Sequence, residues 1–255
     1  TAPVAAIDPA AVGPQALREA AAAGDANAQF EMGSRLAEGR GAARDLKGAA
    51  QWFEKAAAQG LAPAQYRIGS FYEKGLGVAR DPGLARSWYQ RAAERGNARA
   101  MHNLAVLVAD GAGAKPDYAG AASWFRKAAE FGVRDSQYNL AILYARGLGA
   151  EQNLGLSYTW FAAAAKQGDE DAARKRDEVA GRLDAKTLEA AKAAAEAFRP
   201  KPLDRAANEV TQPVGGWGGA PAKTSGAAEP ASGADRPDPQ KSGDRARLPA
   251  RPKAT

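Results

Sequence analysis

Side chains that could perform catalysis are few in this chain. Its 255 residues include no cysteine and one histidine, His102, which excludes a thiol nucleophile, a thiolate metal site and a multi-histidine metal site. No Gly-x-Ser-x-Gly turn accompanies that histidine. Acidic residues are plentiful but are not placed as a glycosidase pair; the run 169–171 begins a predicted helix, where the helix dipole accounts for it. The sequence therefore predicts no enzyme, no cofactor and no metal site.

Charge and glycine patterns also argue against phosphate or nucleic-acid ligands. The turn Gly75-Leu76-Gly77 resembles a phosphate loop in composition, but it lies between two predicted helices and not after a strand. The formal charge is +6, and the basic residues do not cluster. We therefore predict no nucleic-acid partner.

The elements that carry these residues repeat every 36 positions, and the same period appears in several aligned series. These are Trp52, Trp88, Trp124 and Trp160, and Gly24, Gly60, Gly96, Gly132 and Gly168. Internal repeats of this length are typical of stacked helical hairpins, each of which needs its neighbours to bury its apolar face. We predict repeats at 28–63, 64–99, 100–135 and 136–171.

Each repeat is predicted to form two helices. In the second repeat, Ile68 and Tyr72 follow helical spacing, glycines break the chain, and Asp81 caps a second helix. Asp45, Asp117 and Asn153 occupy the same capping position in the other repeats. We expect Trp88 to fill the groove between hairpins, so that Trp88→Ala would cost about 3–5 kcal/mol.

Segments outside the four repeats are predicted to cap and extend the array. Residues 14–27 form a half repeat, so that the repeat region spans 14–171, and 172–198 form closing helices with Asp184 as an N-cap. Residues 1–13 are a predicted linker. Residues 199–255 are predicted to be a disordered tail, since nine of the fifteen prolines lie at 200 or later.

The second repeat resembles the Sel1-like repeat family. The residues that carry the resemblance are Ala64, Ile68, Gly69, Tyr72, Gly75, Gly77, Val78, Asp81, Ala85, Trp88, Arg91, Ala92, Ala93 and Gly96. The resemblance implies an all-α, right-handed α-solenoid, related to tetratricopeptide repeats, that acts as a non-enzymatic protein-interaction scaffold. The third repeat departs most from the pattern, with Val108 in place of the aromatic and Ala105 in place of glycine.

A further resemblance, to polar-localisation factors of the PodJ family, rests on 100–107, 116–118, 135–140 and 198–208. It implies a periplasmic fragment of an inner-membrane protein, anchored upstream of Thr1, that recruits partners at the cell pole. Peptidoglycan binding through the groove or the tail is the alternative function. Trp217, within the tail, either packs on the last helices or is an exposed anchor for a partner or glycan.

The predicted partner-binding groove is the face of the first helices opposite Ile68 and Tyr72. Its residues are Phe30, Ser34, Glu38, Tyr66, Ser70, Glu73, Lys74, His102, Val106, Asp110, Tyr138, Ile142 and Arg146. The rings of Phe30, Tyr66, His102 and Tyr138 would form a ladder suited to an extended peptide or a sugar chain. The alternative is that these rings only fill the joints between repeats.

Overall fold

The computed structural model describes residues 12–112, 114–214 and 216–217, and divides them into two compact units. The N-terminal unit contains 12–97 together with the described residues from 204 onward. The C-terminal unit contains the described residues from 98 to 203. All regular elements in the described ranges are helices, which confirms the predicted all-α class.

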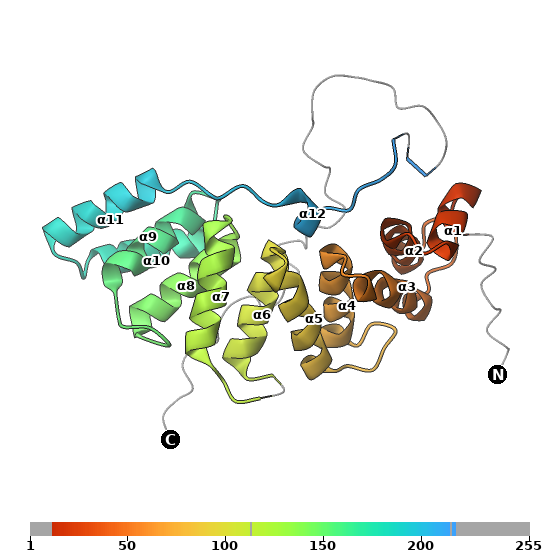
Figure 1. The fold of residues 1–255 in the computed structure, drawn as a ribbon. Coiled ribbons are helices and arrows are strands. Elements are labelled where there is room, and N and C mark those ends of the chain that lie inside the picture. Colours follow the sequence, from red (N-terminus) through yellow and green to blue (C-terminus); the bar gives the residue numbers. More distant parts are fainter. Residues whose placement is uncertain (1–11, 113, 215, 218–255) are drawn as a thin grey trace. The chain divides into compact units, whose positions relative to one another are not determined.

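The N-terminal unit consists of two helical hairpins, a preceding helix and one short helix from the C-terminal segment (Figure 1). Helix α1 packs on α2, and α2/α3 and α4/α5 form the hairpins. The helices are α1 (Gln15–Ala22), α2 (Ala26–Glu38), α3 (Leu46–Ala58), α4 (Ala62–Lys74), α5 (Pro82–Glu94) and α12 (Arg205–Asn208).

The C-terminal unit has two hairpins of the same kind, α6/α7 and α8/α9, followed by two helices that pack on α9. The helices are α6 (Ala98–Asp110), α7 (Tyr118–Glu130), α8 (Arg134–Arg146), α9 (Leu154–Ala165), α10 (Glu170–Ala180) and α11 (Ala185–Ala197). Helix α11 lies within the predicted closing region 172–198 and buries Ala191 and Ala195.

The predicted caps position the second helix of each hairpin. The Asp81 carboxylate accepts a hydrogen bond from the Leu84 amide, and Pro82 follows at the first helical position. Equivalent bonds to Asp45, Asp117 and Asn153 confirm those caps. Asp184 caps α11 in the same way through the Thr187 amide.

The aromatic core of each hairpin is the residue after the repeated tryptophan. Within the described residues, the fully buried rings at this position are Phe53, Tyr89, Phe125 and Phe161. The tryptophans are only partly buried, and Trp88 stacks against the Arg91 guanidinium, 4.7 Å from the ring centroid. Trp88 nevertheless packs against the apolar core formed by α1–α4, as expected of a side chain between hairpins. The fully buried ring is its neighbour Tyr89, since successive helix residues are 100° apart.

Close approach of neighbouring hairpins explains one glycine in the turns of the second and fourth hairpins. Gly77 adopts a φ of 66°, and a Cβ added there would lie 2.2 Å from the carbonyl oxygen of Leu46, at the start of α3. Gly149 meets the backbone of Tyr118 in the same manner. The turn of one hairpin thus rests on the first turn of the second helix in the preceding hairpin, where no other residue fits.

The described part of the C-terminal segment differs from the predicted disordered tail. Within the C-terminal unit, the Lys201 amide donates to the Glu130 carbonyl at 2.8 Å. Within the N-terminal unit, α12 contacts α4, and Trp217 is half-buried against the core that contains Phe53. Trp217 is therefore neither on the last helices nor an exposed anchor. The predicted linker, apart from 12–13, and the tail from 218 onward lie outside the described residues.

The buried aromatic, and not the tryptophan, should dominate stability. We expect Tyr89→Ala to cost about 3–5 kcal/mol, as large core truncations do, and Trp88→Ala less than half of that because Trp88 is only partly buried. Tyr89→Phe is the matched control: it keeps the ring found at 53, 125 and 161 and removes one hydrogen bond to Glu73. Urea unfolding measures all three variants. Equal losses for Trp88→Ala and Tyr89→Ala would contradict this assignment.

Candidate functional site

The four predicted ladder rings share one contact: each packs on the buried aromatic of its own hairpin. The ring centroids of Phe30 and Phe53 are 5.3 Å apart, and those of Tyr66 and Tyr89 are 5.8 Å apart. The corresponding pairs in the C-terminal unit are His102 with Phe125, at 5.7 Å, and Tyr138 with Phe161, at 5.4 Å. Each ring is therefore part of its hairpin's core packing.

Two of these rings are not available to a ligand. His102 and Tyr138 are 8% and 6% exposed. His102 Nδ1 is 2.8 Å from Ser136 Oγ on α8, and the Tyr138 hydroxyl donates to Asp171 on α10 at 2.6 Å. These side chains reach from one first helix to the next element, so they fill the joints. Their interpretation as open groove rings is wrong, because that face of the helix meets its neighbour.

The other predicted groove residues divide by unit. In the N-terminal unit, Phe30, Tyr66, Ser70 and Glu73 are half-buried, Ser34 is buried, and Glu38 and Lys74 are exposed. In the C-terminal unit, Val106 and Ile142 are buried, and Asp110 and Arg146 are exposed. The accessible part of the predicted surface therefore lies mainly on α2 and α4.

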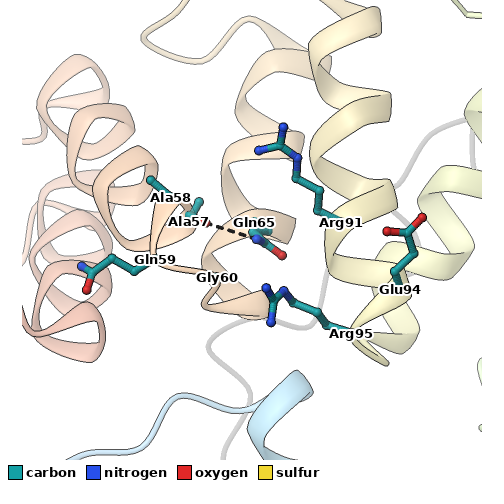
Figure 2. Close-up of a pocket in the computed structure, with 8 residues that line it drawn as sticks. All are labelled: Ala57, Ala58, Gln59, Gly60, Gln65, Arg91, Glu94 and Arg95. Carbon is teal, nitrogen blue, oxygen red and sulfur yellow. Dashed lines mark hydrogen bonds between the residues drawn. The ribbon is translucent and has the colours of Figure 1, made fainter.

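A second candidate site is a cavity of about 380 Å³ in the N-terminal unit (Figure 2). It lies where α3 ends, α4 begins and the last turn of α5 passes by. Its lining residues are Ala57, Ala58, Gln59, Gly60, Gln65, Arg91, Glu94 and Arg95. Two guanidinium groups and small apolar side chains thus border one hollow. The sequence analysis did not predict this site.

A repeated glutamine anchors the start of the first helices. The side-chain amides of Gln29, Gln65 and Gln137 each donate to a carbonyl eight residues earlier, at 3.1–3.2 Å. These bonds satisfy carbonyls in the last turn of the preceding helix, which otherwise lack partners. The three positions differ by multiples of 36, so the repeated glutamine can be found in the sequence from the same period as the tryptophans.

Metal chemistry and membrane insertion find no support in the described residues. They contain no group of three or more His, Cys, Asp or Glu side chains suited to a metal ion. None of the helices in the described ranges is long and apolar enough to cross a bilayer.

Comparison with protein families identifies the repeat. The Sel1 repeat model matches residues 26–61, 62–97, 98–132 and 134–169, which is more than half of the chain. The chain belongs to the Sel1 repeat family. The matched ranges begin two residues before the predicted repeats. Sel1 repeat proteins are protein-interaction scaffolds, and the predicted α-solenoid fold class is confirmed for this member of the family.

Solved structures with the same repeat are similar to this Sel1 repeat protein. A Sel1 repeat protein from Oxalobacter formigenes is 28% identical, with a TM-score of 0.60, and the match covers 71% of this chain and 76% of that one. A protective antigen of uropathogenic Escherichia coli, c5321, is 29% identical with a TM-score of 0.46; the match covers 71% of this chain and 47% of that one. No curated protein matches the chain, so the resemblance to polar-localisation factors stays a prediction.

His102 should make the Sel1 array sensitive to acid. Burial lowers the pKa of His102 to about 4, although the Asp135 carboxylate opposes the shift. Because the pKa of His102 is lower in the folded chain than the unfolded value near 6.5, the unfolded chain takes up the proton first. The stability of the fold therefore decreases as pH falls from about 6.5 to about 4. The difference corresponds to about 3 kcal/mol.

We therefore expect the wild-type chain to lose about 3 kcal/mol more stability than His102→Phe between pH 7 and pH 4. Phenylalanine occupies the equivalent position 30, so the substitution preserves a ring in the joint. Urea unfolding at several pH values measures the difference. Parallel stability curves for the two proteins would contradict a buried neutral imidazole.

Proposed function

We propose that the chain is a non-enzymatic scaffold that binds an extended segment of a partner protein. The observation that carries the proposal is that the hairpin ends already bind a peptide, namely the chain's own residues 200–208. In the C-terminal unit, Lys201 bonds through its backbone amide to the end of α7, and Pro200 lies against Gly132. Helix ends with unpaired carbonyls are suited to such main-chain contacts.

The N-terminal unit repeats this mode of contact at the end of α5. Asn97 Nδ2 donates to the carbonyl of Ala207 at 2.7 Å, and Asn208 Nδ2 donates to the carbonyl of Gly96 at 3.1 Å. A Cβ added at Gly96 would be in van der Waals contact with the Ala207 methyl, at 3.6 Å. The bond from Asn97 and the contact with Ala207 need only a main-chain carbonyl and a small side chain, whereas the bond to Gly96 uses the side-chain amide of Asn208 from the segment itself.

The accessible first-helix residues supply the second element of the proposal. On α4, Tyr66, Ser70 and Lys74 are at i, i+4 and i+8 and combine an aromatic ring with polar and charged groups. Such a mixture of an aromatic residue with polar neighbours is typical of protein-binding surfaces. The predicted groove thus remains a proposed partner surface, limited to the residues that are not buried.

The scaffold proposal is tested by charge changes on two faces. Ser70→Arg with Lys74→Glu alters the α4 face, and Gln51→Arg with Lys47→Glu makes the same charge change on α3 with the same spacing. In quantitative pull-downs with the wild-type chain as bait, we expect partners to lose at least about tenfold enrichment with the α4 variant, since like-charge or unpaired contacts cost several kcal/mol. The α3 variant should retain them.

Retention of every partner by the α4 variant would reject this surface. Absence of any protein enriched over unrelated bait would reject the scaffold function itself.

The finer proposal places this scaffold in the periplasm at the cell pole, as part of a membrane-anchored polar-localisation factor. It is supported by the resemblance of 100–107, 116–118, 135–140 and 198–208 to such factors. The same resemblance supports peptidoglycan as an alternative ligand of the groove or tail.

Co-sedimentation with purified sacculi tests peptidoglycan binding. The comparison is 1–255 with 1–217, because removal of 218–255 leaves α12 and Trp217 in place. If the tail binds the wall, we expect only the longer chain to pellet with sacculi. Equal pelleting would assign binding to the repeats, and no pelleting of either chain would exclude peptidoglycan as a ligand.

A further inference from the structure

The cavity beside Gly60 contains a buried acceptor with no protein partner. Gln65 is 3% exposed, and its Nε2 donates to the Ala57 carbonyl at 3.1 Å (Figure 2). Its Oε1 has no hydrogen-bond partner. A buried, unsatisfied amide oxygen is costly and rare in native proteins. A ligand that brings an N–H or O–H group into the cavity would satisfy it.

The equivalent glutamines show which donor is missing. Gln29 Oε1 accepts from Gln59 Nε2, and Gln137 Oε1 accepts from Gln167 Nε2, both at 2.8 Å. Thirty-six residues after Gln59, the chain has Arg95 in place of glutamine. The amide donor that closes the other two sites is therefore replaced by a cation at this one.

Arg95 and Arg91 give the cavity its charge. Arg91 lies in the last turn of α5, Arg95 is the C-cap residue four positions later, and both line the hollow. The Arg95 guanidinium lies over Gly60, since a Cβ added there would be 2.9 Å from Arg95 Nη2. Within the described residues neither guanidinium forms an ion pair, and the nearby Glu94 accepts a hydrogen bond from Gln90. Two guanidinium groups that line the same cavity favour an anionic ligand such as a carboxylate.

The remaining walls limit the size of the ligand. Ala57, Ala58 and Gly60 present methyl groups or bare backbone to a space of about 380 Å³. At the end of the next hairpin, the corresponding Gly96 contacts the methyl group of Ala207 from the chain's own segment. At the equivalent Gly132 the contact is with the Pro200 ring, so these glycine ends accept compact apolar side chains.

We propose that this cavity binds the C-terminal residue of a peptide. The proposal rests on the proposed scaffold function and specifies which part of the partner protein is recognised. Arg91 and Arg95 bind the terminal carboxylate, and Gln65 Oε1 accepts the backbone N–H of the same residue. The side chain, alanine or another small one, lies against Ala57 and Ala58. The carboxylate and the N–H are one carbon apart in a peptide terminus, so both groups enter the cavity together.

Isothermal titration calorimetry of the full chain with N-acetyl-dialanine tests the proposal. We expect the free acid to bind at least about tenfold more tightly than its C-terminal amide, because charge-assisted hydrogen bonds to both arginines are lost. Arg95→Gln restores the glutamine found at 59 and 167 and should abolish binding. Gln65→Met, with the residue found at the equivalent position 101, should weaken it at least about fivefold.

Lys127→Ala is the matched control, because Lys127 stacks on Trp124 as Arg91 stacks on Trp88 but does not line the cavity. It should bind the peptide as the wild type does. Equal binding of acid and amide, unchanged binding by Arg95→Gln, or no binding to the wild type would overturn the proposal. Equally tight binding of acetate would also overturn it, since the site would then recognise any small anion. If the wild-type chain enriches partner proteins in the pull-down but does not bind the dipeptide, the scaffold function stands and only the proposed peptide site is rejected.

Discussion

The packing of one aromatic ring against one small residue determines the geometry of each hairpin. A Cβ added at Gly69 would lie 2.8 Å from the Tyr89 ring, and one added at Gly33 would lie 2.9 Å from Phe53. The first helix therefore approaches the second closely enough for the ring to lie directly on its backbone. The corresponding positions in the C-terminal unit are Ala105 and Ala141, so the contact tolerates a methyl group but no larger side chain at the first helix.

This contact explains why the predicted ladder rings are structural in one unit and partly accessible in the other. Each ring packs on the buried aromatic of its hairpin, and the polar atoms of His102 and Tyr138 then extend towards the next element. Where that element offers a partner, as Ser136 does for His102 and Asp171 does for Tyr138, the ring is enclosed. The Tyr66 ring makes the same contact with Tyr89 and is half-buried. Position in the repeat thus sets how each ring packs on its own hairpin.

The sequence predicted the helices and their caps well because those features depend on local chemistry. The 36-residue period, the turn glycines and Asp81 are readable without knowledge of tertiary contacts. The choice between Trp88 and Tyr89 as the core ring was not readable, because both lie near the edge of the apolar face and only packing decides between them. Composition indicated disorder after 199, but main-chain bonds from Lys201 and to Ala207 do not depend on apolar side chains.

The cavity beside Gly60 shows how a repeat protein can acquire a specific site without altering its core. The glutamine at position 65 keeps its structural bond to Ala57, as Gln29 and Gln137 keep theirs. Only the residue that completes the amide pair differs, and it is the exposed C-cap residue of α5, where a substitution changes no core contact. Exchange of glutamine for Arg95 therefore converts a closed structural pair into an open, cationic one. The residues that all hairpins share are engaged in holding the hairpins together. A position at which one hairpin departs from the others, such as Arg95, is therefore a better indicator of a ligand site than a shared residue.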